Sequence, residues 1–237
     1  MLTKKFRLAA ALAAFVGIAG FSSCLKSNDT GSVSYASAVQ FFFAAPTGDS
    51  LNVYDNNKLL NTSGSIPAIV TSIVPGGFDP GNHLIQFKTK AGASYPDADA
   101  SLAIDSTRSY WAVVLYDNAP VRSESWKEDF SKASTTKANI RFWNLCKGMP
   151  AIDLYLGTNR IVESAEYANV RSAYARQFTN VDAVYSNVIV KDHNADTVIA
   201  ELKGVQFAAG YIDNFVLTGK VGGTGNTAIK LSRMALQ

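Results

Sequence analysis

The chain has 237 residues, 47% hydrophobic and 17% charged, a balance typical of a folded globular protein and unlike that of a disordered one. It has 22 Lys and Arg residues and 19 Asp and Glu residues. Lys4, Lys5 and Arg7 belong to an N-terminal segment, and removal of that segment leaves 19 residues of each charge. A chain without net charge offers no broad basic surface to phosphates, so we expect no nucleic-acid partner.

Residues 1–23 have the composition of a secretory signal peptide. A positive stretch precedes an apolar run at 8–21, which is shorter than the roughly 20 residues needed to span a bilayer. The run ends in Phe-Ser-Ser directly before Cys24. This ending resembles the bacterial lipoprotein box, although Phe21 stands where that motif usually has Leu. We therefore expect Cys24 to become the lipidated N-terminus; the alternative is an ordinary signal peptide with an incidental cysteine.

Residues 24–37 are rich in Ser, Asn, Asp and Gly and are predicted to be a flexible tether. The residue after Cys24 is not Asp, a pattern that resembles Gram-negative lipoproteins sent to the outer membrane. We expect a protein anchored to the outer membrane by its N-terminal lipid, on the periplasmic or the cell-surface side.

One stretch of the chain occurs twice. Residues 39–60 and 139–162 carry the same pattern, and matching positions differ by 101. The matching pairs are Val39/Ile140, Phe41/Phe142, Phe42/Trp143, Leu51/Ile152, Val53/Leu154, Tyr54/Tyr155 and, further downstream, Tyr110/Tyr211. A constant offset predicts two copies of one folding unit, which we place at 38–131 and 137–237 with a polar linker between them.

The first copy shows the period of two that is typical of strands. Val39 and Phe41 fall on one face of a strand, and Leu51 and Val53 fall on one face of the next. Further strands are predicted at 68–74, 83–90, 98–104 and 109–116, separated by turns rich in Gly, Pro and Asn. Many short strands with such turns indicate an all-β sandwich or barrel.

The second copy is predicted to have its strands in the same order. They are placed at 167–178, 181–190, 196–205, 211–217 and 228–234. The first of them could also form a helix, but the matching stretch at 65–74 is β-branched and contains proline, which favours a strand.

The pattern NIRFWNLCKGMPAIDLYLGTNRIV at 139–162 and the ending FVLTGKVGGTGNTAIKLSRM at 215–234 resemble the family catalogued as domain of unknown function 4397. Its members are secreted or lipid-anchored bacterial envelope proteins, often with tandem copies. The likeness covers nearly all of 38–234 and is closer in the second copy, because the first departs from the pattern at APTGDS, residues 45–50. The resemblance implies two tandem β-sandwich domains with immunoglobulin-like or transthyretin-like topology. It implies no catalytic residues.

Motifs that carry chemistry are sparse. The glycine-rich loop at 222–227 precedes a predicted strand, whereas a dinucleotide-binding loop precedes a helix. His83 alternates with apolar residues, and His193 lies among acidic residues that favour a solvated turn over a cation site. Cys146 ends an apolar strand and is predicted to be a buried thiol. We expect no catalytic residues, no metal and no cofactor.

Four aromatic residues form the candidate binding site. If Val39 and Phe41 face the core, Phe42 and its counterpart face outward. The predicted platform consists of Phe42, Tyr54, Trp143 and Tyr155. Exposed aromatic side chains can stack on sugar rings or anchor a protein partner. The alternative is that a neighbouring strand, a loop or the other copy covers them.

Together these observations predict a non-catalytic lipoprotein of the cell envelope that acts in adhesion, glycan binding or assembly with envelope proteins. One alternative is an envelope hydrolase with a pair of carboxylates that no sequence motif identifies. Another is a passive spacer at the cell surface.

Overall fold

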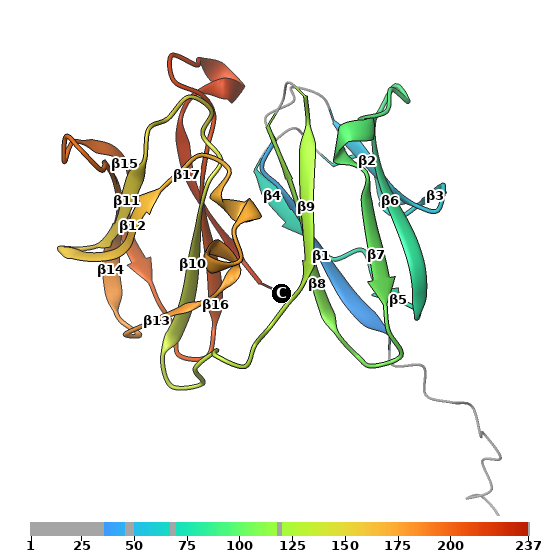
Figure 1. The fold of residues 1–237 in the computed structure, drawn as a ribbon, viewed down its shortest axis with the longest axis horizontal. Coiled ribbons are helices and arrows are strands. Elements are labelled where there is room, and N and C mark those ends of the chain that lie inside the picture. Colours follow the sequence, from blue (N-terminus) through green and yellow to red (C-terminus); the bar gives the residue numbers. More distant parts are fainter. Residues whose placement is uncertain (1–35, 46–49, 67–69, 118–119, 237) are drawn as a thin grey trace, which may run out of the picture. The chain divides into compact units, whose positions relative to one another are not determined.

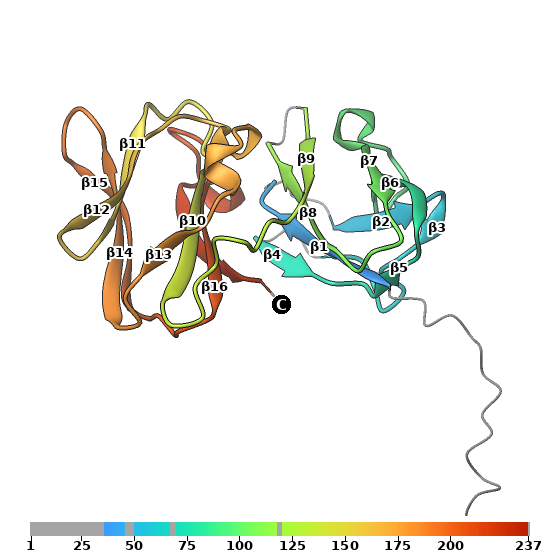
Figure 2. The same cartoon turned by 60° about the horizontal axis from the view of Figure 1, so that its bottom comes forward.

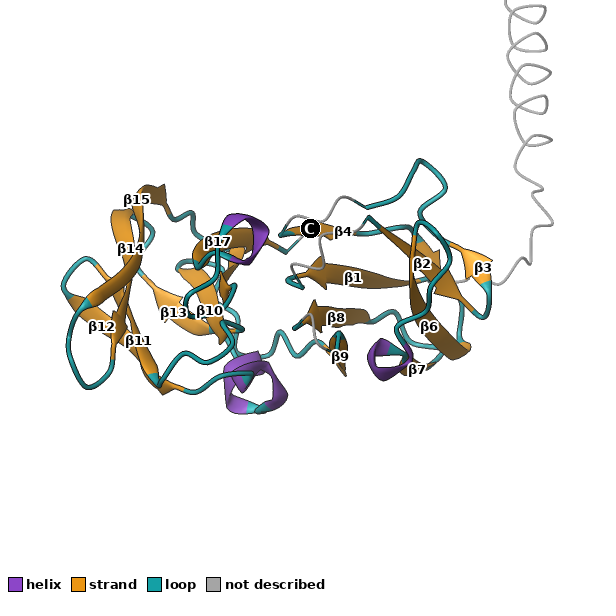
Figure 3. Cartoon of the chain, turned by 90° about the horizontal axis from the view of Figure 1, so that it is seen from above, coloured by secondary structure: helices purple, strands orange, loops and turns teal. Residues whose placement is uncertain are grey.

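A computed structural model describes residues 36–45, 50–66, 70–117 and 120–236. The signal peptide, Cys24 and nearly all of the tether at 24–37 lie outside the described residues. The described chain consists of strands, turns and a few short 3-10 segments, so the predicted all-β class is confirmed (Figure 3). Within this part, no helix is long and apolar enough to cross a membrane.

The first sandwich has two sheets. One is ordered β4 (Thr71–Ile73), β1 (Ser37–Phe43), β8 (Tyr110–Tyr116) and β9 (Arg122–Lys127), with β5 (Gly77–Phe78) also paired to β1. The other is ordered β3 (Lys58–Leu59), β2 (Leu51–Asp55), β6 (Gly81–Thr89) and β7 (Ala100–Ile104). A 3-10 segment, η1 (Pro96–Ala98), precedes β7.

The second sandwich repeats this plan. Its sheets are β13 (Thr179–Val181), β10 (Ala138–Asn144), β16 (Ile212–Thr218) and β17 (Lys230–Ala235), and β12 (Asn159–Ala165), β11 (Ile152–Leu156), β14 (Tyr185–Asp192) and β15 (Val198–Gln206). In both copies the first strand runs parallel to the penultimate one and all other named pairs are antiparallel. Figures 1 and 2 show the two sheets of each sandwich facing each other.

The cores consist of the alternate residues that the sequence pattern identifies. In the first sandwich Val39 and Phe41 from one sheet meet Leu51 and Val53 from the other, and all four are almost fully buried. The matching residues of the second sandwich, from Ile140 to Leu154, form the equivalent core. The inward faces are therefore confirmed for both copies.

The downstream part of the repeat is shifted by one residue from the predicted alignment. Ala38 of β1 is opposite Tyr110, whereas Asn139, the counterpart of Ala38, is opposite Ile212. The offset has therefore grown from 101 to 102, and the predicted match of Tyr110 with Tyr211 is wrong. Since neighbouring residues of a strand face opposite sides, only the corrected register places Val113 and Phe215 at equivalent core positions.

The strand predicted at 167–178 is also wrong. The chain there forms two 3-10 segments, η2 (Asn169–Arg171) and η3 (Tyr174–Arg176), and the strand β13 starts only at Thr179. In the first sandwich β4 pairs with Phe41–Phe43, but β13 pairs with the opposite end of β10, at Ala138–Ile140. The second half of the β10 edge is thus left to the η2–η3 segment, which we define as residues 167–178.

Other predicted connections agree with the structure. No strand lies between β9 and β10, as expected for the linker. The glycine-rich loop joins the antiparallel strands β16 and β17 and contains η4 (Gly225–Thr227), so it connects strands as predicted.

Candidate functional site

Two residues of the predicted platform are buried. Phe42 and Trp143 point away from the core of their own sandwiches, as predicted, but both are 0% exposed. Their rings meet edge to face at 5.3 Å between centroids, within a third apolar cluster that draws residues from both copies. The prediction of an exposed surface at these positions is wrong, because the outward face of each copy packs against the other copy.

The other two platform residues remain half-buried at the surface, each with a lysine over its ring. The Lys88 ammonium lies 4.7 Å from the centre of the Tyr54 ring, and Lys191 lies 4.8 Å from that of Tyr155. In each copy the tyrosine is paired with a residue of the neighbouring strand, Gln86 or Ile189, and the lysine follows two residues later on that strand. One face of each ring is thus in contact with the chain's own cation and is not open for stacking.

The titratable residues outside the platform are held by local contacts. The ring of His83 is bonded to the Asp55 carboxylate at 2.8 Å and to the Asp79 carbonyl oxygen at 2.9 Å. Burial alone would lower the pKa of His83, but these two bonds outweigh it and raise the pKa above its ordinary value. His193 lies 2.8 Å from the Asp153 carboxylate. Among the described residues no three His, Cys, Asp or Glu side chains form a group that could hold a metal.

Cys146 is a free and buried thiol, as predicted. Burial raises its pKa to about 11, because the thiolate would lie in apolar surroundings. Since the thiolate is the nucleophile, this side chain is unreactive near neutral pH.

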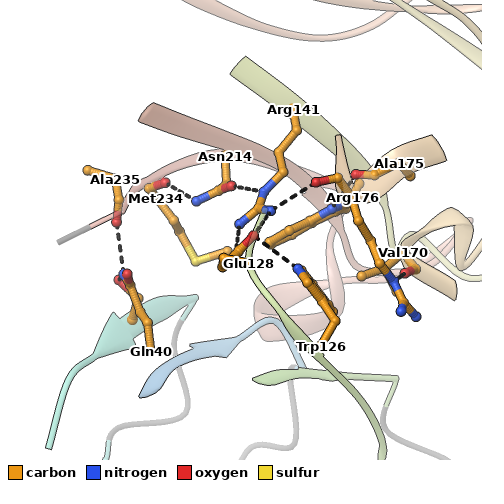
Figure 4. A network of polar contacts seen from close by, with 12 residues as sticks. Gln40, Trp126, Glu128, Arg141, Val170, Ala175, Arg176, Asn214, Met234 and Ala235 are labelled. Carbon is orange, nitrogen blue, oxygen red and sulfur yellow. Dashed lines mark hydrogen bonds and ion pairs between the residues drawn. The ribbon is translucent and has the colours of Figure 1, made fainter. Parts of the chain in front are cut away.

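A buried ion pair joins the two copies beside the aromatic cluster (Figure 4). Arg141 of β10 donates to both carboxylate oxygens of Glu128, which follows β9, at 2.6 and 2.8 Å. The guanidinium also donates to the side-chain oxygen of Asn214 and, at 3.2 Å, to the Arg176 carbonyl oxygen. Both charged side chains are 1% exposed, so the pair depends on this complete set of hydrogen bonds.

The η2–η3 segment is fastened to the β10 edge where no strand covers it. The side chain of Asn169 takes the place of a strand, since it accepts from the Asn144 amide at 2.8 Å and donates to the Phe142 carbonyl oxygen at 3.2 Å. The indole N–H of Trp143 donates to the Ala175 carbonyl oxygen at 3.0 Å. These bonds satisfy backbone groups that would otherwise be buried without partners, and they fix the position of the segment.

The same segment forms one wall of a pocket in the second sandwich. The pocket has a volume of about 300 Å³, and its other walls come from β10 and from the edge strand β12. Its buried residues are the apolar Phe142, Ala165, Ala175 and Phe178 and the charged Arg141, which is paired with Glu128. Its exposed residues are Tyr174 and the polar Glu163, Ser164, Glu166, Ser172, Gln177 and Thr179.

This arrangement is chemically suited to a ligand with an apolar face and polar edges. Tyr174 is 71% exposed and presents an aromatic ring at the mouth of the pocket. Carboxylates, amides and hydroxyls surround the apolar interior, so a ligand that enters it can form hydrogen bonds at its edges. The pocket lies where the second copy departs from the first, and none of the four platform residues lines it.

No family model and no curated protein matches the chain. Among solved structures, the chain is similar to CBMbc, of family CBM26, from Eubacterium rectale Amy13K in complex with maltoheptaose. The sequence identity is 11% and the TM-score is 0.27, over 82% of this chain and 96% of that one.

Proposed function

We propose that this protein is a non-catalytic lipoprotein of the bacterial cell envelope that binds a glycan in the pocket beside the η2–η3 segment. The lipoprotein box before Cys24 supports the envelope location. The composition of the pocket supports the ligand class, because a sugar ring has apolar faces made of C–H groups and an edge of hydroxyls. Tyr174 can stack on such a face, and the surrounding amides and carboxylates can bond such an edge.

The observation that carries the proposal is the exposure of Tyr174 next to a buried apolar interior. A large aromatic side chain that is exposed at a pocket is typical of a binding site, where the ligand buries it. The pocket is also held in shape before any ligand binds, because Asn169 and Trp143 bond the segment to β10. Such pre-organisation reduces the entropy cost of binding.

Replacing Tyr174 with alanine is expected to weaken glycan binding roughly ten- to hundredfold. The ring of Tyr174 would be buried by the ligand, and the burial of a large apolar side chain is worth about 1.5–3 kcal/mol. The measurement is calorimetric titration with the oligosaccharide that gives the strongest signal on an array of defined glycans. Tyr185→Ala is the matched control, since Tyr185 is 70% exposed but does not line the pocket. Equal affinities of the two variants would contradict the proposal.

Two carboxylates at the pocket, Glu163 and Glu166, favour the hydrolase as the second candidate function. Arg160 lies 2.8 Å from Glu163, an ion pair at the surface. If the pocket is catalytic, the bound oligosaccharide will be cleaved during incubation and Glu163→Gln will stop the cleavage. For the binding function we expect the oligosaccharide to be recovered intact, as chromatography of the incubated mixture would show.

Replacing Cys24 with alanine is expected to remove the membrane anchor. The precursor would then lack the sulfur that receives the lipid, and the protein would leave the membrane fraction. Metabolic labelling with a radioactive fatty acid, followed by fractionation of cells, measures both effects. Labelled and membrane-bound Cys24→Ala protein would show that the lipoprotein box is not used.

A further inference from the structure

A second hollow adjoins the proposed glycan pocket. It has a volume of about 290 Å³, and Gln177 and Phe178 line both hollows. Its remaining walls come from η3 and from residues at and after the end of β9 in the first sandwich, among them Trp126. The two hollows therefore share one short stretch of chain, Gln177–Phe178, which we call the divider.

The divider is held in place by contacts of the Phe178 ring. The Phe178 ring stacks on Phe130 with 5.9 Å between centroids and 9° between planes, and the Arg141 guanidinium lies 4.8 Å from its centre. At the surface, Lys132 donates to the side-chain oxygen of Gln177 at 3.1 Å, an exposed bond that an anionic ligand can replace at small cost. A ligand that extends past the divider would thus meet both hollows, which is the arrangement of adjacent subsites for a chain.

The two hollows differ in charge. The second is lined by three cations, Lys127, Lys132 and Arg176, against one carboxylate, Asp129. The first has the carboxylates Glu163 and Glu166, while its one cation, Arg141, is already paired with Glu128. A chain bound across the divider would therefore meet a negative surface at one end and a positive surface at the other.

Lys127 of the second hollow can take a ligand without a large loss. Lys127 pairs with Asp105 at 2.8 Å, but both side chains are about half exposed, at 46% and 53%. Arg176 pairs with Glu124 at 3.2 Å, and these two side chains are only 23% and 26% exposed. An exposed pair such as Lys127–Asp105 contributes little to stability, so an anionic ligand can compete for the lysine at small cost.

We infer that the ligand is an acidic oligosaccharide that crosses the divider, with an uncharged sugar against Tyr174 and an anionic group in the second hollow. The anionic group is a carboxylate or a sulfate, and both would bond the two lysines in the same way. This inference rests on the proposed glycan function and adds the charge and the minimum length of the ligand.

The test is an array that holds neutral oligosaccharides, oligogalacturonates and sulfated glycosaminoglycan fragments, followed by titration of the strongest ligand. We expect the acidic glycans to bind and the neutral ones to bind more weakly. The double variant Lys127→Gln/Lys132→Gln should bind the acidic ligand roughly three- to thirtyfold more weakly. Raising the salt from about 0.05 to about 0.5 M should weaken binding by the wild type more than binding by this variant.

The control is Lys203→Gln/Lys220→Gln, which removes the same charge from exposed lysines that line neither hollow. If the control variant loses as much affinity for the acidic ligand as Lys127→Gln/Lys132→Gln does, the ligand responds only to the overall charge of the protein, and the inference is overturned. Tyr174-dependent binding of neutral glycans alone would also overturn it, while the proposed function would stand. If no glycan binds in a Tyr174-dependent way, both fail.

Discussion

Replacing Trp143 with alanine is expected to lower the free energy of unfolding by about 3–5 kcal/mol, as for other large aromatic side chains removed from a core. The side chain is fully buried between the two copies, where it contacts the rings of Phe42 and Trp126. Its loss would leave a cavity and would also leave the Ala175 carbonyl oxygen without its donor. Unfolding in urea, followed by circular dichroism, measures the change.

Tyr174→Ala serves as the reference for this measurement, because an exposed side chain away from the core usually changes stability by no more than about 0.5 kcal/mol. Trp143→Phe should fall between the two, since phenylalanine keeps most of the apolar contact but cannot donate a hydrogen bond. A loss below about 1 kcal/mol for Trp143→Ala would contradict the packed junction that the structure describes.

Replacing Glu128 with leucine is expected to destabilise the protein by about 3–5 kcal/mol, because it leaves the Arg141 charge buried without a counter-charge. Arg141→Met should have a similar effect, since it leaves the carboxylate in the same position. The double variant Glu128→Leu/Arg141→Met removes both charges and keeps most of the volume. We expect it to regain at least about half of the stability lost in either single variant.

The comparison of single and double variants separates two explanations. If the pair is needed only because each charge needs the other, the double variant recovers stability. If the losses of the single variants simply add, the two side chains act independently and the buried pair does not couple the copies. The free energy of unfolding of the two single variants and the double variant is measured by urea unfolding at the same pH and salt.

The sequence predicts the inward face of each copy well, and the reason is local. The alternation that includes Val39 and Phe41 identifies one side of a strand as apolar, and a sandwich must bury that side. The same alternation places Phe42 on the other side but contains no information about what covers it. The burial of Phe42 and Trp143 depends on contacts between residues about 100 positions apart, so the sequence pattern alone could not show it.

The repeat does not predict the pocket. The strand predicted at 167–178 rests on analogy with the first copy, although the residues of this stretch do not alternate in the strand pattern. The strand pairing shows that the offset between the copies is 102 at their penultimate strands, so the connections before these strands differ in length between the copies. Differences in length between repeated sandwiches fall in connections, and connections often carry function. Tyr174 lies in the connection between β12 and β13.

The junction has a further consequence, which follows from which residues form it. Gln40 and Arg141 are equivalent positions in the two copies, and each contacts the end of the last strand of the other copy. Gln40 donates to the Ala235 carbonyl oxygen at 2.9 Å. Arg141 donates to the carboxylate of Glu128, directly after β9. Phe42 and Trp143, also equivalent, contact each other.

Each copy thus presents the same face to the other, which is the isologous pattern of a two-fold symmetric homodimer. A contact of this kind is closed, because it uses the face of both partners and leaves no free face of the same type to recruit a third. The duplicated chain therefore resembles a dimer whose subunits have been joined by a linker. Once the subunits share a chain, their sequences can diverge, and the η2–η3 segment, which lines the pocket of the second copy, is one place where they have done so.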